Sequence, residues 1–222
     1  MGIFDLNEKA VVIRERFMGS NLYYIDNFYK NPDDIAKLFN TIPNCQHTPG
    51  MEPNAKSLNG IYFDDRRIRL KTDEIIPVWE HLSNIIGYRP ALQHKDCHDV
   101  LTNHFRYRDK SFNKSKDNYW HPHIDRGFNA IVYFNKNDDM CGTNLYKLIH
   151  QDLPISKGEH VEPWRSKKNW ERITTLKPAF NRCVIFDGGK FRHGMHIPDE
   201  RYSGEEYRLN QIFFFQNESS CT

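Results

Sequence analysis

The second half of the sequence is a series of short segments rich in β-branched and aromatic residues, separated by turn-forming residues. Many short strands with turns between them favour a β-sandwich or jelly roll over a fold in which strands and helices alternate. One stretch, 164–176, interrupts the series and is interpreted as a helix. The expected strands span residues 100–107, 120–125, 129–135, 143–149, 182–187 and 208–216.

The first part of the sequence contains two segments with helical periodicity. In 32–41, Pro32 occupies the first helical position and two acidic residues follow it, a pattern that favours helix initiation. Residues 73–86 carry apolar side chains at helical spacing, with the helix proper starting near Pro77 and ending at Gly87. A β-prone run covers 22–28, whereas 43–60 is rich in turn formers.

The length of 222 residues suits one sizeable domain. We therefore predict a single domain over 1–222, mainly β with N-terminal helices. Its helical support region covers about 1–98, and its jelly-roll core covers about 99–217.

Net charge, cysteine spacing and apolar runs indicate which kinds of partner and which cellular compartment to expect. The net charge of +2 argues against the strong overall field typical of a nucleic-acid or membrane partner. The five cysteines are scattered and form no CxxC pair, as in a reduced protein without a structural zinc site. Neither a signal-peptide pattern nor a membrane-spanning apolar run is found, so we expect a soluble cytoplasmic protein.

Two metal-ligand side chains stand two residues apart in the segment 120–125. In an extended chain, His123 and Asp125 would project to the same face. An imidazole and a carboxylate side by side are two thirds of a facial triad for Fe(II). The third ligand is expected to be a distant histidine on a strand that folds back, and His193 and His196 are the candidates.

Arg208 opens a strand that is otherwise strongly apolar. Burying an arginine is costly unless an anion meets it, and a guanidinium binds a carboxylate through two hydrogen bonds. Arg208 is therefore a candidate to bind a dicarboxylate cosubstrate, the alternative being a solvent-exposed position at the strand end.

These motifs together resemble the Fe(II)/2-oxoglutarate-dependent oxygenases. The resemblance is to the prolyl-hydroxylase-like branch, and still more to a little-characterised group of microbial and phage proteins. It covers about residues 100–216, and the start of the sequence at 26–33 is also similar to that group. The matching segments are His123-Ile124-Asp125, Tyr133-Phe134-Asn135, Gly142-Thr143, Phe191-Arg192-His193 and Arg208-Leu209-Asn210.

The resemblance implies a double-stranded β-helix (a cupin-like jelly roll) that uses Fe(II) and 2-oxoglutarate. His123, Asp125 and His193 would hold the iron. Arg208 would bind the distal carboxylate of 2-oxoglutarate, and Tyr133 would add a hydroxyl group to the same carboxylate. The implied reaction is hydroxylation of a substrate by O2, with decarboxylation of 2-oxoglutarate to succinate. The retained Asp125 favours hydroxylation over halogenation.

Four features bear on how far this resemblance extends. Cys141 replaces the first glycine of the family's Gly-Gly pair, and an insertion around 199–206 lengthens the distance to Arg208. His193 is preferred over His196 as the distal ligand because a glycine follows it, as in the family. His121 is expected beside the metal without binding it, or facing the substrate.

Two alternatives from other classes stay open at this stage. One is a non-catalytic metal-binding jelly-roll module, and the other is a zinc-dependent hydrolase that uses His121 and His123. The substrate is expected to be an amino acid, a peptide or protein, or a small metabolite. Nucleic acid is less favoured, although the basic and aromatic stretches 110–116 and 164–170 could contact it or select another substrate. No membrane partner is expected.

Overall fold

The computed structural model describes residues 2–41, 63–69, 73–87, 98–107, 115–136, 142–150, 164–198 and 208–215. Cys141, the insertion at 199–206, the turn-rich segment 43–60 and most of the basic stretch 110–116 lie outside these residues. The described chain is mostly β-sheet with few helices, as the sequence predicts. No helix in it is long and apolar enough to cross a membrane.

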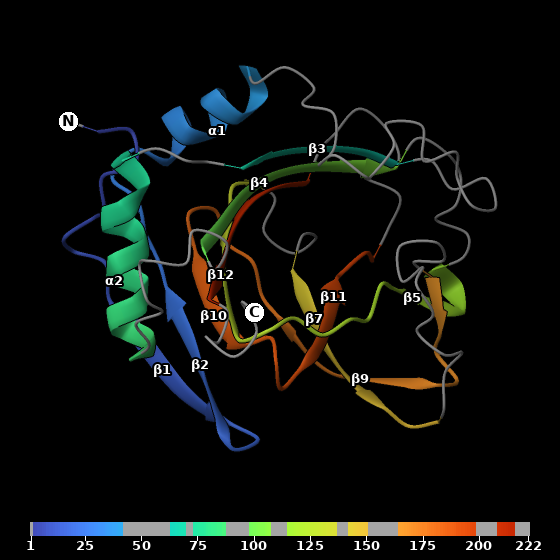
Figure 1. Cartoon of the computed structure of the whole chain (residues 1–222). Helices are drawn as coiled ribbons and strands as arrows, with labels where there is room; N and C mark the ends of the chain where they lie inside the picture. Colours follow the sequence, from blue (N-terminus) through green and yellow to red (C-terminus); the bar gives the residue numbers. More distant parts are fainter. Residues whose placement is uncertain are drawn as a thin grey trace.

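A seven-stranded sheet forms the largest element (Figure 1). Its neighbouring strands pair antiparallel throughout. In spatial order the strands are β1 (Val12–Phe17), β2 (Ser20–Ile25), β10 (Cys183–Asp187), β6 (Phe128–Tyr133), β12 (Arg208–Phe215), β4 (His98–Tyr107) and β3 (Phe63–Arg69).

A smaller antiparallel sheet faces the large one. It consists of β11 (Arg192–Met195), β7 (Thr143–Leu148) and β9 (Trp170–Leu176), in that order. Beside it, β5 (Asn118–Trp120) pairs with β8 (Trp164–Ser166). A single antiparallel bridge between His123 and His193 joins the chain after β5 to β11.

Two helices cover the outer face of the large sheet. Helix α1 spans Pro32–Thr41, and the short 3-10 helix η1 (Asp73–Ile75) leads into α2 (Ile76–Ile86). Gly87 ends α2 in the left-handed conformation, at φ 75°, and its N–H donates to the carbonyl of Ser83. Both helices therefore form where the sequence predicts them.

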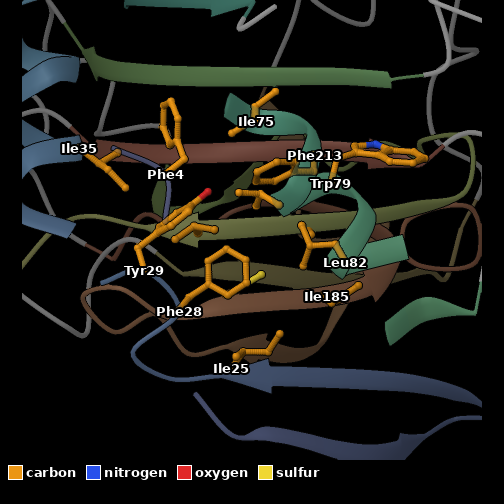
Figure 2. Close-up of a cluster of buried hydrophobic side chains, with 14 of the residues drawn as sticks. Phe4, Ile25, Phe28, Tyr29, Ile35, Ile75, Trp79, Leu82, Ile185 and Phe213 are labelled. Carbon is orange, nitrogen blue, oxygen red and sulfur yellow. The ribbon is translucent and has the colours of Figure 1, made fainter. Parts of the chain in front are cut away.

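The apolar stripes of these helices pack on the large sheet and form the outer core (Figure 2). Ile35 of α1 and Leu82 of α2 are fully buried there, against Ile25, Ile185 and Phe213 of the sheet. A second cluster, the inner core, fills the space between the two sheets. It includes Ile131, Tyr133, Leu145, Val184 and Phe186.

Strand alternation assigns the residues of the central strands to one core or the other. On β6, Ala130 and Val132 belong to the outer core, whereas Ile131 and Tyr133 belong to the inner core. On β12, Leu209 and Phe213 pack outward and Ile212 packs inward. Arg208 and Asn210 share the parity of Ile212, so they lie on the inward side of the sheet.

The helix expected over 164–176 is wrong, because this segment forms β8, a turn and β9. The turn at 167–169 falls in the middle of the segment, so no continuous helix can form. The run Ile173-Thr174-Thr175 is β-branched and favours a strand, and β9 pairs with β7 along its length.

The expected support region at 1–98 also supplies strands to the large sheet, namely β1, β2 and β3. The β-prone run at 22–28 overlaps β2. The six residues of β1 are mostly exposed, and its sequence lacks the apolar alternation from which a half-buried strand could be predicted. Arg14, Glu15 and Arg16 give β1 the charged character typical of an edge strand.

Candidate metal centre

Three side chains with metal-binding atoms converge where the chain after β5 meets β11. One ligand atom from each of His123, Asp125 and His193 lies within 4.8 Å of the other two. Asp125 bridges the pair: its Oδ2 is 3.0 Å from Nε2 of His193, and its Oδ1 is 3.8 Å from Nε2 of His123. The structure thus brings together the three residues that were predicted from the sequence as ligands.

The backbone holds these residues in place through paired hydrogen bonds. The N–H of His123 donates to the carbonyl of His193, and the N–H of His193 donates to the carbonyl of His123, at 3.0 and 2.8 Å. The N–H of Asp125 donates to the carbonyl of Gly188 at 3.0 Å, which ties the loop to the end of β10.

The strand expected over 120–125 is shorter than predicted, because β5 ends at Trp120. His121 has a positive φ of 43°, which breaks the extended conformation, and only the single bridge at His123 follows. The backbone of Trp120 and His121 passes so close to β11 that a Cβ on Gly194 would lie 2.3 Å from the carbonyl oxygen of Trp120. Gly194 is therefore required for this close approach, independently of its place in a family motif.

Hydrogen bonds to backbone carbonyls set the tautomer of both imidazoles. Nδ1 of His123 lies 2.7 Å from the carbonyl oxygen of His121, and Nδ1 of His193 lies 3.0 Å from that of Phe191. A carbonyl oxygen can only accept, so Nδ1 of each ring carries a proton. Nε2 is then the atom that can bind a metal, and in both rings it faces Asp125.

Asp125 is ionised in this environment. Burial acts to raise the pKa of its carboxyl group, but hydrogen bonds from His193 and Asn129 and the charges of the two imidazoles outweigh that effect. The pKa of Asp125 therefore lies well below its usual range.

Asn129, on β6, is a site residue that the sequence analysis missed. It is 2% exposed, and its Nδ2 donates to Oδ2 of Asp125 and lies 3.1 Å from Nε2 of His193. Gly188 makes room for this amide, because a Cβ there would lie 2.8 Å from Nδ2 of Asn129. The pattern Asp-x-x-x-Asn carries no signal of its own, since only the fold brings Asn129 back onto Asp125.

Arg208 and Tyr133 also lie close together on neighbouring strands. Arg208 is 4% exposed, and its guanidinium carbon lies 5.8 Å from the centre of the Tyr133 ring. Tyr133 is fully buried, and its hydroxyl group is 2.8 Å from Oγ1 of Thr143. The solvent-exposed alternative for Arg208 is therefore wrong.

Asn210 shares the inward side of β12 with Arg208 and pairs across the strands with Tyr133. It is fully buried, and neither polar atom of its side chain has a hydrogen-bond partner among the described residues. Buried amides are normally satisfied, so this pair of open hydrogen-bonding groups marks a place where a ligand could bind.

The other two candidate histidines, His121 and His196, are placed differently from His123 and His193. The ring of His121 stacks on that of His123, with centres 4.4 Å apart, and the carbonyl group of His121 accepts from His123. His196 lies beyond the end of β11, where its N–H donates to the carbonyl of Gly142. Neither belongs to the cluster of potential ligands found in the described residues.

Comparison with known proteins gives distant similarities only. No family model matches the sequence, and no curated protein matches it. The chain is similar to a solved oxidoreductase of the 2OG-Fe(II) oxygenase family from Burkholderia pseudomallei, with 13% identity and a TM-score of 0.40, over 84% of this chain and 78% of that one. It is also similar to the Fe(II)/(alpha)ketoglutarate-dependent dioxygenase TqaL, with 10% identity and a TM-score of 0.43, over 84% and 74% of the two chains. Because both similarities are distant, the roles of individual residues rest on the side chains of this chain itself.

Proposed function

We propose that the protein is an Fe(II)- and 2-oxoglutarate-dependent oxygenase that hydroxylates its substrate. The observation that carries this proposal is the cluster of two imidazoles and one carboxylate, with both Nε2 atoms directed toward Asp125. In this proposal the two facing sheets are the double-stranded β-helix of a single domain.

The donor set fits the proposed metal. Two imidazoles and one ionised carboxylate would hold the ion and leave coordination positions for other ligands, the donor set of non-haem Fe(II) oxygenases. The ligands come from two separate parts of the chain, joined by the bridge between His123 and His193. Asn129 orients Asp125, because its amide binds one carboxylate oxygen and leaves the other for the metal.

Arg208 and Asn210 would bind the cosubstrate. A guanidinium buried to 4% exposure on the inward side of β12 suits the distal carboxylate of 2-oxoglutarate. The unsatisfied amide of Asn210 lies two residues further along the same face. The hydroxyl group of Tyr133 is already hydrogen-bonded to Thr143, so we expect it to contribute less than Arg208.

When bound, iron and 2-oxoglutarate would supply the oxidising chemistry, in which O2 is activated and the cosubstrate is decarboxylated to succinate. The protein's own contribution is positioning and exclusion of water. His193 is 4% exposed and packs edge-on against Phe186, at 4.9 Å between ring centres, so this side of the site is apolar. Asp125 keeps its charge at neutral pH and anchors the site between the two imidazoles.

The zinc-hydrolase alternative is not favoured by this geometry. It requires His121 beside His123 as a ligand, whereas the cluster in the described residues contains Asp125 and His193 instead. The non-catalytic alternative predicts metal binding without turnover of 2-oxoglutarate.

Anaerobic reconstitution tests the proposal. The protein should bind Mn(II), then 2-oxoglutarate in a metal-dependent manner, by isothermal titration. With Fe(II) and O2, it should form succinate, and the substrate can be sought by mass spectrometry of a treated lysate. Metal binding without any metal-dependent binding of 2-oxoglutarate would favour the non-catalytic module.

A further inference from the structure

A pocket of about 330 Å³ lies between the β5–β8 ribbon and the smaller sheet. Asn144 and Tyr146 of β7 line it, whereas Leu145 between them packs into the inner core. The pocket therefore borders the outer side of β7, whereas Trp120, Trp164 and Met195, which also line it, belong to the inner core or pack against it. His193 pairs with Leu145 across β11 and β7, and the three potential metal ligands do not line the pocket. The pocket and the cluster of potential metal ligands are therefore formed by different side chains.

The lining of this pocket is cationic. Lys116, Lys167 and Arg172 all line it, and none of the described residues that line it is an aspartate or glutamate. His196 lines it too, and burial, together with the nearby Arg172, lowers the pKa of that imidazole. His196 therefore adds a neutral hydrogen-bonding group at neutral pH, and the three cations face the pocket without a carboxylate among the described residues that line it.

Lys167 is held in position by groups that do not neutralise it. Its Nζ donates to the carbonyls of Ser115 and Lys116, at 2.6 and 2.8 Å, and lies 5.3 Å from the centre of the Tyr119 ring. These contacts fix the ammonium group at the start of β5 and leave its charge available. A cation that is already fixed loses little conformational freedom when an anion binds.

We propose that this pocket binds the phosphate group of a phosphate ester. A phosphate monoester carries a charge of about −1.5 to −2 and three strong acceptor oxygens, which suits several convergent cations better than a single carboxylate does. The volume lies at the low end of the range for ligand pockets, about 300–1,000 Å³. A small phosphorylated molecule, or one nucleotide of a single strand, is of this size class. The site does not depend on the oxygenase function proposed above.

Isothermal titration of the metal-free full-length chain tests this site. The probes are inorganic phosphate, a nucleoside 5′-monophosphate, a single-stranded oligothymidylate and, as a carboxylate for comparison, succinate. The wild-type protein should bind the phosphate-bearing probes, and Arg172→Glu and Lys116→Glu should each weaken binding at least about tenfold, as expected for the loss of a charge-assisted contact. Tighter binding of the monophosphate would identify a small molecule as the source of the phosphate, and tighter binding of the oligothymidylate a nucleic acid.

Lys168→Glu is the matched control. Lys168 is exposed on the β8–β9 turn next to Lys167, but it does not line the pocket. Lys168→Glu therefore makes the same change of charge as the two test variants and leaves the pocket intact. Its affinity should stay within about twofold of wild type, since exposed charges interact weakly through screened solvent. Equal losses in all three variants would show general attraction to a basic surface and overturn the site. Tighter binding of succinate than of inorganic phosphate would overturn the assignment to phosphate, and so would no binding of any probe at millimolar concentration.

Discussion

The two faces of the large sheet carry different kinds of side chain, although the same strands supply both. The outward face of β6, β10 and β12 is mostly apolar, with Gln211 as a buried polar residue, and is covered by α1 and α2. The inward face carries Asn129, Tyr133, Arg208 and Asn210 among its apolar residues. Alternation along a strand lets one residue serve the core while its neighbour serves the site.

The faces also differ in how they treat polar groups. On the outward face, Gln211 accepts a hydrogen bond of 2.6 Å from the hydroxyl group of Tyr29, which comes from a distant part of the chain. On the inward face, Asn210 is equally buried, but neither polar atom of its side chain has a hydrogen-bond partner in the described part of the chain. Gln211 is thus only partly satisfied by the chain itself, since its Nε2 has no partner among the described residues, whereas both polar atoms of Asn210 are open.

Truncation on the outward face should give the largest effect. Phe213 is fully buried beneath the helices, so Phe213→Ala should destabilise the protein by about 3–5 kcal/mol through lost burial and a cavity. Denaturant unfolding measures the change. Metal affinity of the folded fraction should not change, and a large loss of affinity would mean that the two faces are coupled.

Removal of a potential metal ligand on the inward side should mainly weaken metal binding rather than lower stability. His193→Ala should weaken Mn(II) binding by more than about 100-fold, since loss of an outer partner alone costs 10–100-fold. His196→Ala is the control and should bind almost as wild type, because His196 lies outside the cluster. If the two variants changed places in a metal titration, the choice of distal ligand would be wrong.

Arg208→Ala should raise the Kd of 2-oxoglutarate by about 30-fold or more while metal binding stays constant. The cause is a desolvated carboxylate left without its partner. Arg208→Lys should recover part of the loss, since an ammonium group lacks the guanidinium fork. Titration with Mn(II) in place of iron measures both variants, and an unchanged Kd in Arg208→Ala would remove the main support for this cosubstrate.

Asn129→Ala should weaken Mn(II) binding by about tenfold, because Asp125 loses the amide that orients it. The readout is metal affinity by titration rather than turnover. Asn210→Ala, two strand positions from Arg208, serves as a comparison. It should leave metal affinity unchanged and affect 2-oxoglutarate alone, so equal metal defects in both variants would argue against a specific role for Asn129.

The smallest effect is expected for the ion pair between Asp26, just after β2, and Arg182, just before β10. Arg182 forms two hydrogen bonds with Asp26, and the hydrogen bond from Arg182 lowers the pKa of that carboxyl group. The pKa of Asp26 is thus lower in the folded protein than in the unfolded protein, where it is about 3.9. The ionised carboxyl group therefore stabilises the fold above about pH 3.9, and this stabilisation is lost as the pH falls through the folded pKa. Asp26 is half exposed, so Asp26→Asn should cost only about 0.2–1 kcal/mol at pH 7. Unfolding curves at pH 7 and pH 3 should differ less for the variant than for wild type.

The features that could be predicted from sequence are those with local signals. Pro32 with its acidic neighbours and Gly87 mark helix ends, and the spacing of His123 and Asp125 predicts two members of the cluster of potential metal ligands. The strands β8 and β9 were missed because their aromatic and charged residues fit either periodicity, and tertiary pairing with β7 decides the outcome. Asn129 could not be found because its role depends on Gly188, which lies 59 residues later in the chain and is brought beside it only by folding.

The separation of the ligands along the chain has a consequence for stability. Asp125 and His193 are 68 residues apart, so a bound metal would act as a dissociable cross-link within the chain. Unlike a disulfide, such a cross-link is released on unfolding, and its strength follows the free metal concentration. At 100 times the Kd it would stabilise the fold by about 2.7 kcal/mol, and chelation would remove all of that.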